Sequence, residues 1–125
     1  MMLAHFAADF TLQGILADLK QRRWWQKKVQ GDLDRSKYRD DYIAALFVHS
    51  MYWSACVVAP FAFTGYVGTM CWSVLFAINS AIHAAVDHLK ANERDMNLVQ
   101  DQCIHGVQLV VTALIMLIAH HAGAK

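Results

Sequence analysis

The stretch YIAALFVHSMYWSACVVAPFAFTGYVGTMCWSVLFAINSAIHAAV, residues 42–86, decides the fold class of this chain. It contains no Asp, Glu, Lys or Arg, and a second stretch without these residues covers 102–124. An uncharged apolar run of about 18 residues or more is typical of a transmembrane helix. The first stretch is long enough for two such helices and a turn. A soluble helix would carry charges on its outer face, so the sequence predicts an integral membrane protein.

The overall composition agrees with this prediction. Hydrophobic residues make up 57% of the 125 residues, above the roughly 45–50% of a soluble domain. Charged residues make up only 17%, against about 25%. Cys56, Cys71 and Cys103 lie in apolar segments and form no CxxC pair, so they are expected to be free thiols. We interpret residues 1–125 as a single helical membrane domain.

The expected fold is all-α, an integral membrane bundle of about four helices. Their predicted ranges are 2–23, 40–63, 67–90 and 96–121, and Pro60 falls in the last turn of the second helix, where a proline kinks or ends a helix. The first helix is the least hydrophobic. We expect it to be tilted or only partly inserted.

A basic loop at residues 24–40 sets the expected orientation. Most of the eleven Lys and Arg residues lie between Lys20 and Arg39, and Lys90 and Arg94 flank a second polar loop. The 64–68 turn, TGYVG, carries no charge. Loops rich in Lys and Arg stay cytoplasmic. The pattern therefore favours a multi-pass protein of the bacterial inner membrane with both termini outside.

The expected partners follow from this placement. The lipid bilayer is the first, and a second copy of the chain or another membrane protein is the next. A basic run that contains Trp24 and Trp25 can also contact phosphates of nucleic acid. A juxtamembrane loop explains the same residues better, so nucleic acid is not expected as a partner.

Polar residues recur at similar depth on all four predicted helices. With a rise of 1.5 Å per residue, they lie about 10–16 Å from the cytoplasmic helix ends. An ionisable group there costs about 2.5–3.5 kcal/mol and normally faces the bundle interior. We therefore expect one cluster, whose candidate metal ligands are His5, Asp9, His49, His83, Asp87, Asp101 and His105.

The His and Asp residues form pairs one helical turn apart: His5 with Asp9, His83 with Asp87, and Asp101 with His105. Such a pair can ligate one ion, or its carboxylate can orient the imidazole. The mixture favours a divalent metal, Zn²⁺ first. A hydrogen-bond network between helices and a proton or ion pathway remain alternatives.

Other polar residues receive supporting roles. Asp9 and Asp101 are the candidate general bases of any metal-assisted catalysis. Trp53 and Trp72 are interpreted as packing or lipid-facing residues, and His120 and His121 as residues at the end of the last helix. The residues expected to play a structural polar role are Gln13, Asn79, Lys90 and Gln102.

Three short motifs resemble an uncharacterised family of bacterial and phage membrane proteins, domain of unknown function 3307. Residues 4–13 match AHxxADFxLQ, residues 83–90 match HxxxDxxK, and residues 101–105 match DQxxH. His49 corresponds to the second-helix histidine of that family. The resemblance implies a short polytopic membrane protein and brings no established activity. The long basic loop departs from the family pattern.

Three functional hypotheses follow. The first is an intramembrane metal site, with hydrolysis of an amphiphilic substrate as its activity. The second is a non-enzymatic membrane effector, such as phages encode, that binds a membrane protein or perturbs the bilayer. The third is an ion or proton conduit. The sequence alone does not decide whether the chain is an enzyme.

Overall fold

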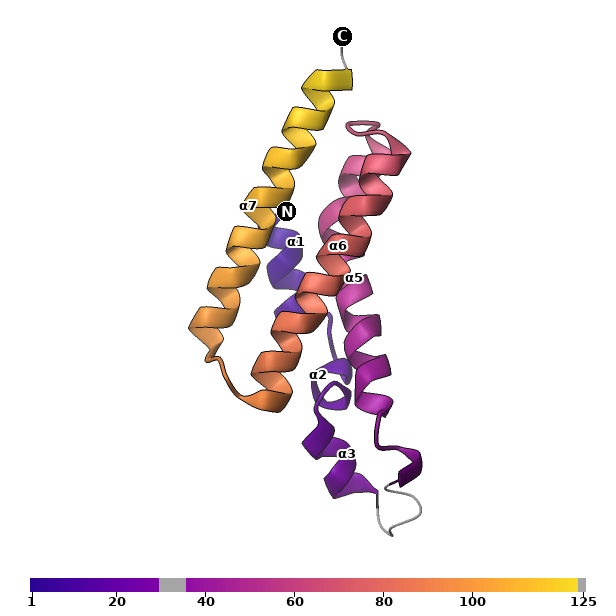
Figure 1. Cartoon of the computed structure of the whole chain (residues 1–125), viewed down its shortest axis with the longest axis vertical. Coiled ribbons are helices and arrows are strands. Elements are labelled where there is room, and N and C mark those ends of the chain that lie inside the picture. The colour runs from indigo at the N-terminus through magenta and orange to yellow at the C-terminus, as the bar shows by residue number, and fades with distance from the viewer. Residues whose placement is uncertain (30–35, 124–125) are drawn as a thin grey trace.

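The fold is known from a computed structural model that describes residues 1–29 and 36–123 (Figure 1). Within these ranges every regular element is a helix, which confirms the all-α prediction. Residues 30–35 of the predicted basic loop lie outside the described residues.

Three long helices make up most of the structure. They are α5 (Asp41–Phe63), α6 (Thr69–His88) and α7 (Leu98–Gly123), and a π-helical turn, η2 (Leu89–Glu93), extends α6. Their most apolar windows have mean hydropathies of 1.5, 1.4 and 1.9, so all three are long and apolar enough to cross a membrane. The predicted second, third and fourth helices are confirmed, with bounds shifted by a few residues. α5 continues past Pro60 and ends at Phe63.

The N-terminal segment differs from its prediction. A single helix over 2–23 was expected, but the chain forms α1 (Met2–Phe6), the π-helical turn η1 (Ala7–Thr11), α2 (Leu16–Leu19) and α3 (Arg22–Lys28). The helix stops after Thr11, and Gly14 adopts a positive φ of 49°. A left-handed residue cannot continue a right-handed helix.

The consequence is a bundle with only three membrane-length helices among the described residues. A bundle of four crossing helices is therefore not confirmed. α1 and η1 together are about 15 Å long, roughly half of a hydrocarbon core of about 30 Å. Figure 1 shows that the chain starts beside the middle of α7, and that α2 and α3 lie near the end of the bundle where α6 connects to α7.

The distribution of polarity is the reverse of that in a soluble bundle. Val107, Val110, Leu114 and Ile118 of α7 are all more than half exposed. The buried face of the same helix carries polar residues. Gln108 Nε2 donates to Asn79 Oδ1 at 2.9 Å, and Thr112 Oγ1 donates to the same oxygen at 3.1 Å. Polar side chains that join helices beneath an apolar outer surface are what a lipid environment favours.

Candidate metal centre

Histidine and aspartate side chains from four elements meet inside the bundle. η1 supplies Asp9, α5 supplies His49, α6 supplies His83 and Asp87, and α7 supplies Asp101 and His105. The three imidazoles have an exposure of 0%, and the three carboxylate residues are also buried. The buried His/Asp cluster that the pattern of the helices predicted is thus present.

The tightest part of the cluster surrounds His49 and His83. Their Nε2 atoms lie 3.2 Å apart. Asp9 Oδ1 lies 3.5 Å from each of these nitrogens. Asp87 Oδ2 lies 3.3 Å from His49 Nε2 and 3.7 Å from His83 Nε2. Two nitrogens and two oxygens from three separate elements therefore face one another.

These separations fit a tetrahedral metal ion. Zinc bonds of about 2.0–2.1 Å place neighbouring ligand atoms about 3.3–3.4 Å apart in a tetrahedron. The five distances around His49 and His83 run from 3.2 to 3.7 Å. Imidazole nitrogen and carboxylate oxygen are both ordinary zinc ligands. His49, His83 and Asp87 present donor atoms close enough together to hold a divalent ion.

A second group of donors adjoins the first and shares Asp87 with it. His105 Nε2 lies 3.4 Å from Asp101 Oδ1 and 3.8 Å from Asp87 Oδ1. Asp87, Asp101 and His105 are close enough to hold an ion by themselves, and so are His49, His83 and Asp87. Asp87 presents one oxygen to each group. The His105 ring also stacks on the His83 ring, with centroids 4.2 Å apart.

No family model matches the chain, and neither a curated protein nor a solved structure matches it. The resemblance to domain of unknown function 3307 therefore stays a prediction.

His5 belongs to the cluster, but both of its ring nitrogens form hydrogen bonds with other side chains. Trp53 Nε1 donates to His5 Nδ1 at 2.9 Å, so the His5 proton sits on Nε2, which donates to Gln102 Oε1 at 3.0 Å. Gln102 Nε2 in turn donates to Asp101 Oδ2 at 2.9 Å. This chain of hydrogen bonds gives His5 a positioning role. A third group that could hold an ion consists of Asp9, His83 and His105, and among the described residues His5 is in none of the three groups.

Trp53 is a buried packing residue, as one of the two alternatives for it predicted, and its exposure is 0%. The contact with the cluster was not predicted: the Trp53 ring stacks on His83 with centroids 4.3 Å apart. It therefore touches two histidines of the cluster. The only signal in the sequence was its spacing, because Trp53 follows His49 by one helical turn.

Two lysines balance part of the negative charge. Lys20 Nζ donates to Asp87 Oδ2 at 2.6 Å, and Lys90 Nζ donates to Asp101 Oδ2 at 2.5 Å. Lys90 was expected to be a structural polar residue, whereas Lys20 was assigned only to the basic region. The break in the N-terminal segment brings Lys20 to the cluster. Three carboxylates against two ammonium groups leave the cluster one negative charge with neutral imidazoles, which favours a cation.

Other candidate residues lie outside the donor groups. Gln13 Nε2 donates to the backbone oxygen of Asp9. Cys103 is exposed, and His88 pairs with Glu93 at 3.2 Å. At the other end of α7, His120 Nδ1 donates to the backbone oxygen of Tyr66 at 2.9 Å.

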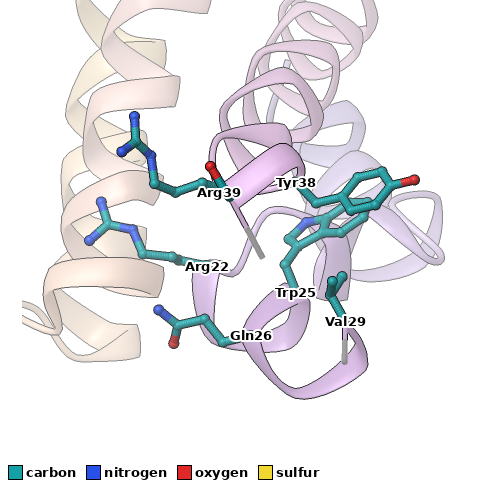
Figure 2. A pocket seen from close by; sticks show the side chains of 7 residues that line it. Arg22, Trp25, Gln26, Val29, Tyr38 and Arg39 are labelled. Atoms are coloured by element: carbon teal, nitrogen blue, oxygen red, sulfur yellow. The ribbon is translucent and has the colours of Figure 1, made fainter. Parts of the chain in front are cut away.

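A separate hollow of about 340 Å³ lies in the basic connection before α5. Figure 2 shows the ring of Trp25 beside that of Tyr38, with Arg22 and Arg39 extending away from these rings. The two rings are stacked, with an interplanar angle of 12°. None of the His/Asp cluster residues lines this hollow.

Proposed function

We propose that the chain is a multi-pass protein of the bacterial inner membrane whose His/Asp cluster binds a divalent metal ion, with Zn²⁺ favoured. The observation that carries the proposal is the meeting of His49 Nε2 and His83 Nε2 at 3.2 Å beside two carboxylates. We further propose that the metal supports hydrolysis of an amphiphilic substrate.

The orphaned polar atoms support a metal over a purely structural hydrogen-bond network. Asp9 Oδ1, Asp101 Oδ1 and His105 Nε2 are buried and have no hydrogen-bond partner among the described residues. Buried polar atoms are normally paired, and an unpaired one costs about 1–3 kcal/mol. Asp9 Oδ1 lies beside His49 Nε2 and His83 Nε2, and Asp101 Oδ1 lies beside His105 Nε2. A cation bound among these atoms would satisfy groups that the hydrogen bonds leave unpaired.

The cluster has the groups that metal-assisted hydrolysis needs. A bound divalent ion would lower the pKa of a coordinated water and polarise the bond to be cleaved. Asp101, with His105 beside it at 3.4 Å, is the candidate to accept the proton of that water. Apolar helices around the cluster suit a substrate with a hydrocarbon part.

The packing beyond the cluster disfavours an ion or proton conduit. Beyond the buried polar residues Asn79, Gln108 and Thr112, the bundle toward the 64–68 turn is filled by buried apolar side chains, namely Val57, Val58, Val67, Leu75 and Met116. A conduit needs polar groups along its whole length. The polar cluster instead lies toward the end of the bundle that carries Lys20 and Lys90.

Metal analysis of the full chain, purified in detergent without chelator, tests the proposal. We expect wild type to contain zinc, and His83→Ala and His49→Ala each to lose it. His120→Ala, at the far end of α7, should keep it. Circular dichroism checks that the variants remain helical. Equal metal contents in wild type and in the correctly folded His83→Ala variant would overturn the proposed centre.

A further inference from the structure

A polar cleft leads from the surface to the cluster. It has a volume of about 400 Å³, and Asp87 forms part of its wall. The other charged residues of its lining are Lys20, Arg23, Lys90 and Arg94. Asp87 therefore belongs both to the candidate metal ligands and to this cleft, so a molecule in the cleft reaches the metal centre at Asp87.

The charge of the cleft is strongly positive. Four cationic side chains line it against one carboxylate. An adjoining hollow of about 240 Å³ shares Arg23 and Arg94, adds Arg22, and has no acidic residue in its lining. Lys20 and Lys90 already pair with Asp87 and Asp101. Among the described residues, Arg23 and Arg94 pair with no carboxylate, and Arg23 Nε donates to Gln21 Oε1 at 2.7 Å.

The cations differ in a way that suits a tetrahedral anion. The two lysines stand at the inner end, where each ammonium contacts a cluster carboxylate. The two arginines line the same cleft from different elements: Arg23 lies on α3, and Arg94 follows η2. Guanidinium groups bind phosphate oxygens in pairs, and lysine binds them as a point charge.

We propose that this cleft binds the phosphate group of a phosphate ester and presents its phosphorus atom to the metal centre. The inference rests on the proposed metal centre for its chemistry, but not for the binding step. In the reaction, water attacks phosphorus, the bond between phosphorus and the ester oxygen breaks, and the leaving oxygen takes a proton. The products are an alcohol and inorganic phosphate. The ester is either a lipid headgroup or a soluble metabolite.

Binding is tested first, by calorimetry on the full chain in detergent with EDTA present. The probes are dihexanoyl phosphatidic acid, glycerol 3-phosphate and uncharged dihexanoyl glycerol. We expect dihexanoyl phosphatidic acid to bind, either alone or together with glycerol 3-phosphate. Dihexanoyl glycerol should not bind. Binding of phosphatidic acid alone identifies a lipid headgroup, and binding of glycerol 3-phosphate as well identifies the phosphate itself as the recognised group.

Variants of the two arginines locate the binding site. Arg23→Gln and Arg94→Gln should each weaken binding of the phosphate ester about tenfold, since each loses a charged hydrogen-bond donor. Their metal contents should equal that of wild type. Arg39→Gln is the matched control, because Arg39 is exposed, pairs with Asp40 and does not line the cleft. With zinc added, the two cleft variants should also release inorganic phosphate more slowly at low substrate concentration.

Two results overturn the inference without touching the metal centre. One is a zinc-containing wild type that binds neither phosphate ester. The other is unchanged affinity in both cleft variants. If wild type binds phosphate esters but holds no metal, the proposed metal centre fails and the anion site stands.

Discussion

At the scale of single residues, the cluster depends on hydrogen bonds that fix which nitrogen carries a proton. Trp53 Nε1 can only donate, so its bond to His5 Nδ1 places the His5 proton on Nε2. That proton is then donated to Gln102, which supports Asp101. A residue of α5 thus orients a carboxylate of α7 through the N-terminal segment.

Replacing Trp53 by phenylalanine tests this chain. An aromatic ring remains against His83, but the N–H that defines the His5 tautomer is lost. Loss of an outer hydrogen-bond partner typically lowers metal affinity about 10- to 100-fold, and we expect at least the lower value in a zinc titration. Trp72→Phe is the control, since Trp72 Nε1 also donates a hydrogen bond, to the Val58 oxygen at 3.2 Å, away from the cluster. Equal affinities for the two variants would contradict the positioning role of Trp53.

Replacement of Lys20 is expected to change the zinc affinity in the opposite direction. Its ammonium lies 2.6 Å from Asp87 Oδ2 and repels any cation held by that oxygen. Lys20→Gln should therefore bind zinc more tightly than wild type, by about tenfold or more at the low effective dielectric of a buried site. Without metal, the same variant should be less stable, because Asp87 loses its counter-charge. A weaker zinc affinity in this variant would show that Lys20 supports the ligand geometry rather than competing with the metal.

At the scale of elements, the sequence predicted the long helices well and the N-terminal segment poorly. Uncharged length alone locates α5, α6 and α7. The four-residue spacing of His5, Asp9 and Gln13 suggested one continuous helix, but η1 and the left-handed Gly14 interrupt it. The partner of Lys20, Asp87, depends on where that interruption places the chain, so no helical spacing could reveal it.

Two glycine substitutions compare the break before α2 with the regular helix α7. Gly14 has a φ of 49° in the break before α2, so Gly14→Ala should destabilise the fold by about 1 kcal/mol, although a Cβ there meets nothing within 4 Å. Gly106 lies inside α7 and also has open space around a Cβ, so Gly106→Ala should stabilise by about 0.5–1 kcal/mol. Unfolding of the purified protein by SDS titration measures both. A stabilising Gly14→Ala would show that the segment from Met2 to Lys20 does not need its break.

At the scale of the whole molecule, charge is concentrated at one end. Lys20, Arg22 and Arg23 lie on or beside α2 and α3, and Lys90 and Arg94 lie at or after η2. The turn between α5 and α6, at the other end, carries no charge. The cluster and its polar cleft face the charged end. The positive-inside rule predicts that this end is cytoplasmic, and we propose that a substrate enters from that side.

Cysteine labelling tests this orientation. Cys56, Cys71 and Cys103 are first replaced by alanine. Single cysteines are then introduced as Ser36→Cys, before α5, and Thr64→Cys, after it; both positions are exposed. Thr64 is preferred to Gly65, whose φ of 66° would strain any side chain. A membrane-impermeant maleimide should label Thr64→Cys in intact spheroplasts and Ser36→Cys only after lysis. The reverse pattern would invert the orientation and move the cleft to the periplasmic side. Labelling of both positions from the same side would mean that α5 does not cross the bilayer, because one crossing helix must place its two ends in different compartments.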